Sequence, residues 1–236
     1  MQVPKFSIIT VVYNGEGIVD KTMSSVAEQT FNDYEHIIID GRSSDKTLEI
    51  VEHYKSLKLI VVSEKDKGIY DAMNKGVKIA KGQYLIFMNA GDCFVDMHTL
   101  SRVSEQLDGV HHFYGDSIRI YNGESYLKKE KVNSFSITRH NICHQSIFYL
   151  RKQSIHYDLK YMIFADWVLN IKEFCTCGFK HICTPVCQFS MDGISSTTDR
   201  MKDKAFMDDL PALSREYLGF FQFLYVKIRF IIRQYV

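Results

Sequence analysis

The first hundred residues alternate between short hydrophobic runs and longer amphipathic segments. Four hydrophobic runs show no alternation of polar and apolar positions, a pattern typical of strands that are covered on both faces. These runs are Phe6–Val12, Tyr34–Ile39, Leu59–Val62 and Tyr84–Met88. Segments with helical spacing lie between them, at Gly17–Glu28, Asp45–Tyr54 and Ile69–Lys81. Because strands and helices alternate, the pattern predicts an α/β fold with a doubly wound, mostly parallel sheet and helices on both faces.

The pattern changes in the second half of the chain. Short alternating segments with the turn signal Asn122-Gly123 indicate antiparallel strands within Val110–Leu127. Further on we expect a strand, a helix and a pair of short strands bent at Pro185, which are His144–Leu150, Ala165–Phe174 and Lys180–Ser190. The economical interpretation is one α/β domain over residues 1–198 with a mixed second half, followed by a helical tail over residues 199–236.

Composition and charge exclude several classes of protein. The 236 residues are 46% hydrophobic and 24% charged, as in an ordinary globular protein. With 29 Lys and Arg against 28 Asp and Glu, the chain lacks the basic excess of a protein that works mainly by wrapping nucleic acid. We expect neither a secretory signal nor a spanning helix, since the longest nearly uncharged apolar stretch, Leu218–Val226, is shorter than the required length of about 20 residues. The protein is therefore expected in the cytoplasm, with reduced thiols.

Polar side chains follow each of the four predicted strands of the first half. The segments are Tyr13-Asn14-Gly15, Asp40–Asp45, Ser63–Gly68 and Asn89–Asp92. In an open parallel sheet, ligands bind beyond the carboxyl ends of the strands. We therefore expect these segments to line one ligand-binding site.

This expected site lacks the glycine-rich motifs that bind phosphates. Gly15-Glu16-Gly17 follows the first strand, but Asp20 stands where a dinucleotide motif has its third glycine, and no P-loop motif is present. An anionic ligand at an edge that carries Asp40, Asp66 and Asp92 would need a bridging cation. Asp92, directly after a buried strand, is the natural ligand for that cation.

Several segments together resemble one enzyme family. They are FSIITVVYNG at the start of the chain, IIIDGRSSDKT after the second strand, SEKDKGIYDAMNKGVKIAKGQYLIFMNAGD across the third and fourth strands, and later HQSIFY, FADWVL and MDGISS. Their order and spacing closely resemble family-2 glycosyltransferases of the GT-A fold over Phe6–Ser196. The resemblance implies a Rossmann-like catalytic domain that transfers a sugar from a nucleotide-diphosphate donor to an acceptor hydroxyl. Residues 1–95 would form its nucleotide-binding half and residues 96–198 its acceptor-binding half.

The resemblance also implies roles for residues at the strand ends. Donor binding falls to Tyr13, Asp40, Asp66, Asn89 and Asp92. Asp92 matches the last carboxylate of the family's D-x-D-like metal motif and would hold Mn²⁺ or Mg²⁺ on the diphosphate. The motif is incomplete in this chain, because alanine stands two positions before Asp92.

The same resemblance assigns residues in the second half of the chain. Asp166 matches the catalytic aspartate and would act as the general base of an inverting displacement. The alternative for this residue is a structural one, in which it only caps the helix that begins there. His144 and Gln145 would lie beside the diphosphate or the acceptor. Ser195 and Ser196 belong to a loop that would close over the donor.

The substrate class follows from the resemblance alone. It implies a nucleotide-sugar donor, with UDP as the nucleotide and a hexose or N-acetylhexosamine as the sugar. The implied acceptor is a glycan, commonly lipid-linked, in the biosynthesis of bacterial capsule, O-antigen or exopolysaccharide. Such an acceptor would place the enzyme in the cytoplasm, peripherally on the inner face of the cell membrane. Nucleic acid is not among the expected partners.

Three other interpretations are left open by the residues. A sugar nucleotidyltransferase would use the same sheet edge, an Asp that contacts the base, and a cation, and a non-catalytic nucleotide-sugar binder would use the same pocket. A zinc-binding module is suggested by the density of Cys175, Cys177, His181, Cys183 and Cys187. Their spacing, however, lacks the C-x₂-C pair that is common in structural zinc sites.

The last twenty residues, Tyr217–Val236, contain seven aromatic and three basic residues and no acidic one. On a helical projection Gln222, Arg229 and Arg233 lie opposite an apolar face, which comprises Phe220, Phe221, Leu224, Tyr225, Ile228, Ile231, Ile232 and Tyr235. A basic, aromatic-rich amphipathic helix is typical of an element that lies on a membrane surface. The alternative is a helix that packs on the catalytic domain or on a second copy of the chain, forming a homodimer.

Overall fold

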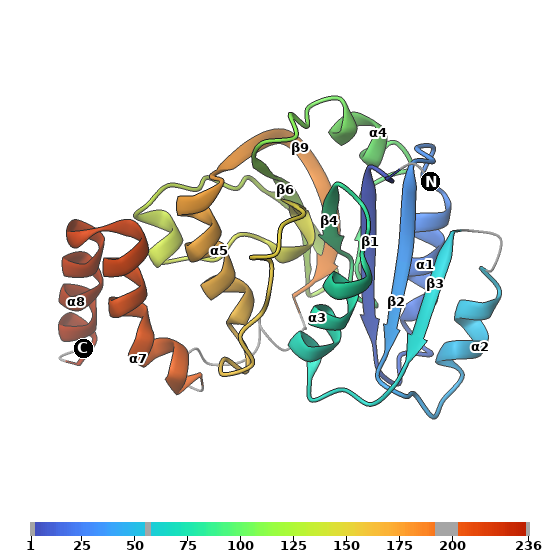
Figure 1. Cartoon of the computed structure of the whole chain (residues 1–236), viewed down its shortest axis with the longest axis horizontal. Coiled ribbons are helices and arrows are strands. Elements are labelled where there is room, and N and C mark those ends of the chain that lie inside the picture. The colour runs from blue at the N-terminus through green and yellow to red at the C-terminus, as the bar shows by residue number, and fades with distance from the viewer. Residues whose placement is uncertain (1–2, 55–57, 192–202, 235–236) are drawn as a thin grey trace.

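The computed structural model describes residues 3–54, 58–191 and 203–234. Within these ranges the strands form one nine-stranded sheet in the order β3-β2-β1-β4-β8-β6-β9-β5, and β7 pairs with β6 beside this path. Figure 1 shows the sheet at the centre of the molecule, with the helices of the tail at the end far from β2 and β3. The mixed α/β architecture agrees with the predicted fold class.

The first half of the chain is built as predicted. Its four strands are parallel, and they are β1 (Phe6–Val12), β2 (Tyr34–Asp40), β3 (Leu59–Ser63) and β4 (Tyr84–Phe87). The helices between them are α1 (Val19–Ala27), α2 (Thr47–Glu52) and α3 (Ile69–Ile79). Because successive strand residues point to opposite faces, Ile38 packs with α1 and α2 on one face while Ile37 and Ile39 pack with α3 on the other.

One expectation for the first half is wrong. β3 was expected to be covered on both faces, but Val61 in its middle is 43% exposed. The reason is that β3 is the outermost strand of the sheet, where it pairs with β2 alone. An apolar run of this length does not distinguish a central strand from an edge strand.

The chain after β4 adds further strands, most of them in antiparallel pairs, and further helices. They are β5 (Cys93–Phe94), α4 (Thr99–Ser104), β6 (His112–Tyr121), β7 (Glu124–Lys128), η1 (Ser136–Thr138), η2 (His144–Ser146), β8 (Ile147–Leu150), α5 (Ala165–Thr176) and β9 (Phe179–Ser190). The predicted turn at Asn122-Gly123 is confirmed, with φ angles of 50° and 81° in a hairpin between β6 and β7. The strand expected over His144–Leu150 starts only at Ile147, because the first three residues form the 3₁₀ turn η2.

The pair of short strands expected over Lys180–Ser190 is instead the single long strand β9. It runs parallel to β6, and the register between them shifts around Asp116, which is the residue opposite Pro185. Proline has no N–H to donate, and strands tolerate it at such irregularities. Pro185 therefore marks a bulge in one strand rather than a turn between two.

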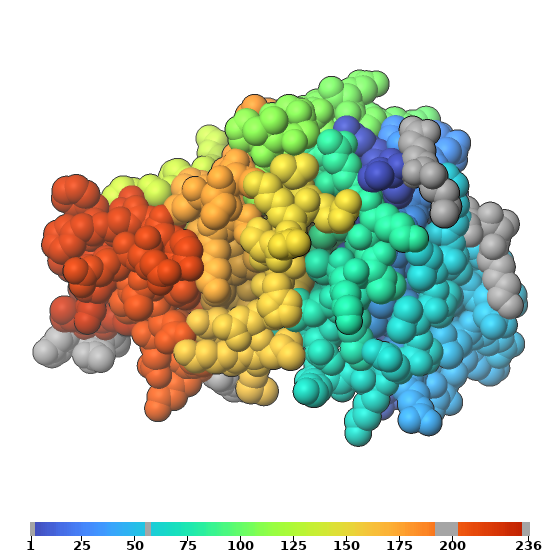
Figure 2. Space-filling model, viewed as in Figure 1, coloured from blue at the N-terminus to red at the C-terminus, as the bar shows by residue number. Residues whose placement is uncertain are grey.

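The tail forms two helices, α7 (Lys204–Leu213) and α8 (Phe220–Gln234), joined through the π-helical segment η4 (Ser214–Leu218). Gly219, with φ of 111°, separates η4 from α8, a backbone conformation that favours glycine. These helices make up one end of the molecular surface (Figure 2). No helix in the described ranges is both long and apolar enough to cross a membrane.

Helix α8 packs on the domain through an unexpected face. Gln222, predicted on the side opposite the apolar stripe, is buried and donates to Ser134 Oγ over 2.9 Å, and Val226 joins the main core. The predicted apolar stripe faces outward instead, with exposed side chains at Phe220, Phe221, Leu224, Ile228, Ile231 and Ile232. The helix therefore contacts the domain and still exposes a hydrophobic surface, and its contact with a membrane or a second copy of the chain stays a prediction.

A buried hydrogen-bond network holds the parallel strands in register at the edge of the sheet where they begin. The Glu35 carboxylate, only 7% exposed, accepts from Ser7 Oγ at 2.6 Å and from the Gly82 amide at 3.2 Å. The Gly82 amide also lies 2.7 Å from Ser7 Oγ. These contacts join β1, β2 and the turn that leads into β4.

We predict that Gly82→Ala destabilises the protein by more than about 2 kcal/mol, a size typical of overpacking in a core. A Cβ atom at this position would lie 2.4 Å from the Ser7 amide nitrogen and 2.5 Å from the Phe6 carbonyl carbon, neither of which can move without disturbing β1. Gly17→Ala is the matched control, because a Cβ there meets nothing within 4 Å. Urea unfolding of both variants checks this, and equal midpoints would contradict it.

Candidate active site

Two adjoining cavities lie beyond the carboxyl ends of the parallel strands. The sheet-edge cavity, about 690 Å³, is lined by residues that follow β1, β2 and β3, including Tyr13 and Asp66. The central cavity, about 750 Å³, is lined by residues of both halves, including Asp92 and Asp166. Ile69, Asn89 and Ala90 line both. The strand-end rule therefore located the sheet-edge cavity correctly, and the second half of the chain supplies most of the central one.

Tyr13 and Asp66 frame the sheet-edge cavity on either side of Gly41. A Cβ atom on Gly41 would lie 3.1 Å from Asp66 Oδ2 and 3.2 Å from the Tyr13 ring, so glycine permits this close approach. The Tyr13 side chain is 68% exposed and free to cover a ligand. Asp66 is held from behind by Lys75, which also pairs with Glu64 at 2.9 Å. These residues offer a flat aromatic surface and a fixed carboxylate.

Asp40, grouped with them by sequence, does not line either cavity. It is fully buried, and its carboxylate accepts from Ser63 Oγ at 2.6 Å and from the Ser43 amide at 3.1 Å. Its lone pairs thus hold the loop after β2 against the end of β3. The structure gives Asp40 a positioning role behind the cavity rather than a place on its surface.

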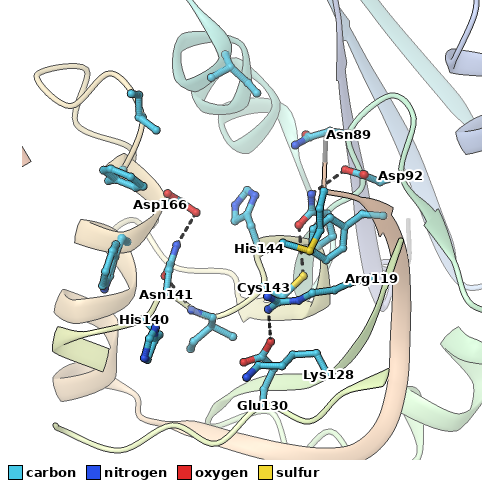
Figure 3. A pocket seen from close by; sticks show the side chains of 18 of the residues that line it. Asn89, Asp92, Arg119, Lys128, Glu130, His140, Asn141, Cys143, His144 and Asp166 are labelled. Carbon is cyan, nitrogen blue, oxygen red and sulfur yellow. Dashed lines mark hydrogen bonds and ion pairs between the residues drawn. The ribbon is translucent and has the colours of Figure 1, made fainter. Parts of the chain in front are cut away.

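Asn89 and Asp92 lie on a turn that Thr22 of α1 fixes in place. The Thr22 hydroxyl oxygen lies 2.7 Å from the carbonyl oxygen of Asp92 and accepts from the Gly91 amide at 2.9 Å. The Asp92 carboxylate faces the central cavity and accepts from Gln145 Nε2 over 2.8 Å (Figure 3). Burial raises the pKa of Asp92 to about 6, although the Gln145 hydrogen bond favours the charged form.

The turn also fits the divalent cation that the family resemblance implies. The Asn89 Oδ1 atom is buried and has no hydrogen-bond partner among the described residues. It is drawn beside Asp92 in Figure 3, so an amide oxygen and a carboxylate border the same space. Hard cations such as Mg²⁺ and Mn²⁺ prefer oxygen ligands of these two kinds. Ala90 contributes no ligand, so the remaining coordination positions would belong to water and phosphate oxygens.

Asp166 enters the central cavity from the first turn of α5. Its carboxylate accepts from Tyr70 Oη at 3.0 Å and from Asn141 Nδ2 at 2.6 Å, and the Tyr70 hydroxyl also contacts the Ile163 carbonyl oxygen. Burial raises the pKa of Asp166 to about 6, while these hydrogen bonds work in the opposite direction. Both side-chain partners come from outside α5, while backbone hydrogen bonds from Asp166 and Trp167 in the first turn of α5 also lower the pKa of this carboxyl group.

His144 is a neutral part of the cavity wall. Its ring stacks on Phe87 at 4.8 Å between ring centroids, and its Nε2 lies 2.7 Å from Tyr157 Oη. Burial lowers the pKa of His144 to about 3, so the ring carries no charge near pH 7. Gln145 is the member of this pair that reaches a candidate functional group, Asp92. The two loop serines, Ser195 and Ser196, lie outside the described residues.

Sequence reasoning assigned no role to Tyr70 or Asn141, the two side chains that orient Asp166. Tyr70 lies in the segment IYDAMNKG, which carried the resemblance, but on a helix rather than at a strand end. Asn141 lies in an irregular stretch just before His144. Both residues lie close in sequence to segments that carried the resemblance, and this was the only sign of a role in the site. Their hydrogen bonds to Asp166 join segments that are distant in sequence, so no local pattern could have predicted them.

The zinc interpretation is not supported by the described geometry. One group of His, Cys, Asp and Glu in the described ranges is close enough to hold a metal, namely His112, Glu173 and Cys177, and only Cys177 belongs to the expected set. His112 Nδ1 accepts from the Leu150 amide at 2.9 Å, so its Nε2 carries the hydrogen and donates to Glu173 over 2.9 Å. Both ring nitrogens of His112 therefore have hydrogen-bond partners within the protein, without a metal ion.

Comparison with known proteins identifies the family. Residues 7–170 match the family model for glycosyl transferase family 2. A PGL/p-HBAD biosynthesis glycosyltransferase of Mycobacterium bovis (strain BCG / Pasteur 1173P2) is 33% identical over 225 residues, which cover 91% of this chain and 87% of that protein. The chain therefore belongs to glycosyl transferase family 2 and is a glycosyltransferase, which replaces the nucleotidyltransferase interpretation.

Solved structures support the GT-A fold. S. aureus TarS 1-349, in complex with UDP-GlcNAc, aligns with a TM-score of 0.73 at 20% identity over 89% of this chain and 66% of that one. The mannosyltransferase PcManGT from Pyrobaculum calidifontis, in complex with GDP-Man and Mn²⁺, aligns with a TM-score of 0.62 at 16% identity over 96% of this chain. The chain spans 64 to 66% of the length of these two proteins.

Each candidate carboxylate has one amide donor, which allows a paired prediction. Asn141→Ala removes a donor to Asp166, and Gln145→Ala removes the donor to Asp92. Because a donor stabilises the charged form, its loss raises the pKa of its own partner above about 6 and leaves the other unchanged. NMR titration of carboxyl-labelled protein measures both values. A fall in either pKa, or identical shifts in both variants, would contradict the assignment.

Proposed function

We propose that the protein is an inverting glycosyltransferase that moves a sugar from a UDP-sugar to a hydroxyl group of a glycan acceptor. One observation carries this proposal: Asp166, a carboxylate whose pKa burial raises to about 6, lines the cavity that adjoins the sheet edge. A general base works best when its pKa lies near the working pH, since it is then both ionised and basic. The orientation of Asp166 by Tyr70 and Asn141 supports the same role.

In this proposal the donor spans both cavities. The nucleotide occupies the sheet-edge cavity beside Tyr13 and Asp66, and Asp40 holds the loop between them. The diphosphate lies at the junction, where Asn89 and Asp92 would hold Mg²⁺ or Mn²⁺, which neutralises phosphate charge when bound. UDP is favoured because a TarS complex contains UDP-GlcNAc, whereas the more distant PcManGT complex contains GDP-Man and Mn²⁺.

The reaction is a single displacement. The acceptor hydroxyl oxygen forms a bond to the anomeric carbon while Asp166 takes the hydroxyl proton. The bond between that carbon and the phosphate oxygen breaks, and the nucleoside diphosphate leaves with the bonding electron pair. At pH 7 most Asp166 side chains are ionised, since the pKa is about 6. Below that value the base becomes protonated and transfer slows.

The proposed division of the catalytic domain follows the cavities. Residues 1–95 supply the sheet-edge cavity, so they form the nucleotide-binding half, and residues 96–198 supply most of the central cavity and form the acceptor-binding half. A lipid-linked glycan of a bacterial surface polysaccharide is the proposed acceptor. This class is supported by the similarity to a PGL/p-HBAD biosynthesis glycosyltransferase, which acts in glycoconjugate synthesis by its name.

We also propose that residues 199–236 attach the enzyme to the cytoplasmic face of an anionic membrane. The outward face of α8 exposes large apolar side chains, among them Phe221 at 74% and Phe220 at 60%. Lys227, on the same helix, is also exposed. Helix α8 contains no acidic residue. A helix of this kind binds a bilayer through its apolar side chains, and its basic residues attract anionic headgroups.

Asp166→Asn is expected to reduce sugar transfer by about 10² to 10⁴, the usual contribution of a general base. Binding of UDP, measured by calorimetry, is expected to stay unchanged, because Asp166 does not line the sheet-edge cavity. Asp208→Asn, an exposed position on α7, is the control for loss of one carboxylate. Full turnover in Asp166→Asn, measured as acceptor-dependent release of nucleoside diphosphate, would refute the catalytic assignment.

For the tail, we expect a variant with Phe221→Ser, Leu224→Ser and Ile228→Ser to bind phosphatidylglycerol vesicles at least about tenfold more weakly, since each side chain loses apolar burial. The control variant carries serine at three exposed apolar positions elsewhere, Val61, Met97 and Val110. Vesicle co-sedimentation measures the difference. Unchanged sedimentation would overturn the membrane proposal, and a dimer that dissociates only in the α8 variant would favour self-association instead.

A further inference from the structure

The side of the central cavity that lies away from the two candidate carboxylates is basic. Arg119, Lys128, Lys129 and Lys131 line it, together with Glu130. In Figure 3, Arg119, Lys128 and Glu130 lie across the cavity from Asn89, Asp92 and Asp166. None of these basic residues entered the sequence-based assignment of the site, and the proposed reaction does not use them.

Strand pairing brings the basic side chains to one surface. In the β6–β7 hairpin, Ser117 pairs with Lys128 and Arg119 pairs with Tyr126. Residues that pair directly in antiparallel strands point to the same face, as do residues two positions apart on one strand. Arg119 and Lys128 are therefore diagonal neighbours on the same face of the hairpin. The chain then leaves β7 through residues 129–131, which extend the basic surface along the cavity.

Arg119 is held rigidly at this surface. Its guanidinium donates to Glu130 over 2.8 Å, and its Cζ atom lies 5.7 Å from the centre of the Phe189 ring. Its Nε atom is buried and has no hydrogen-bond partner among the described residues. A buried guanidinium N–H without an acceptor is costly, so an oxygen atom of a ligand that reaches this N–H would satisfy it.

The positive charge at this end is only partly neutralised by the protein. One carboxylate, Glu130, forms an ion pair with Arg119 and also acts electrostatically on Lys128, while no ion pair connects Lys128, Lys129 or Lys131 to another residue of the described ranges. Asp92 and Asp166 have their own donors at the opposite side. The proposed donor diphosphate lies at the junction of the two cavities, near Asn89. The basic surface is thus left for the other substrate.

We propose that this surface binds a phosphate group of the acceptor, so that the acceptor is a phosphorylated glycan rather than a neutral one. This inference rests on the proposed function, and it names the class of its acceptor. Four basic residues exceed what a single carboxylate would need, and they suit a pyrophosphate or a phosphodiester chain. Two sources share that chemistry: a lipid pyrophosphate and a polymer of phosphodiester-linked units.

The test measures binding to the full chain saturated with UDP and Mg²⁺, so that the donor cavity is filled. Three probes are titrated: a hexose joined to a decyl chain through pyrophosphate, the same hexose as a neutral decyl glycoside, and a short glycerol-phosphate oligomer. One variant carries Lys128→Gln, Lys129→Gln and Lys131→Gln. Its control carries Lys46→Gln, Lys58→Gln and Lys81→Gln, which remove the same charge at exposed positions outside both cavities.

We expect at least one phosphate probe to bind about tenfold more tightly than the neutral glycoside, and this preference to disappear in the first variant and persist in the control. The better phosphate probe identifies the source, lipid pyrophosphate or phosphodiester polymer. Equal binding of all probes, or an unchanged preference in the first variant, would overturn the inference. Because binding needs no sugar transfer, failure of the proposed function shows separately, as absence of transfer to every acceptor.

Discussion

The parallel pairing of β1 with β2 and β4 is the constraint on which the whole site depends. Phe6 is level with Tyr34 on one side and with Tyr84 on the other, and β1 and β2 end level with each other. β4 ends earlier, opposite Ile9, but the chain after it continues beside β1, where the Ala90 amide donates to the Val11 carbonyl oxygen at 3.3 Å. The turns that follow them therefore bring Tyr13, Gly41 and Asn89 to one edge. At the opposite edge the buried Glu35 carboxylate holds these strands in register. A slip of one residue would exchange the two faces of a strand and separate these turns.

The two halves of the molecule are joined at the two candidate functional carboxylates. Tyr70 of α3 reaches Asp166 of α5, and Gln145 of the second half reaches Asp92 of the first. Each contact is a single hydrogen bond from a neutral donor to a carboxylate. Neither carboxylate is paired with a cation in the described ranges, so burial dominates and raises both pKa values to about 6. The site consequently has two groups that change charge together slightly below neutral pH.

The sequence predicted the local elements and the residues at strand ends, because the hydrophobic pattern and the strand-end rule are both local. Asp92, Asp66 and Tyr13 lie at the predicted edge for this reason. Tertiary contacts decided the rest. Ser63 donates a hydrogen bond to the Asp40 carboxylate, which keeps that side chain away from the cavities. Ser134 accepts a hydrogen bond from Gln222, so the expected polar face of α8 lies against the domain. Such hydrogen bonds join segments that are distant in sequence, so the local periodicity of hydrophobic residues cannot predict them.

The central claim is that Asp166 activates the acceptor for one direct displacement at the anomeric carbon. A single displacement inverts the configuration of that carbon, whereas a double displacement or a reaction on the leaving-group face retains it. The most direct measurement is proton NMR of the newly formed glycosidic linkage during transfer from an α-linked UDP-sugar. The account predicts a β-linked product from the first turnovers. An α-linked product would contradict it and would require another role for Asp166.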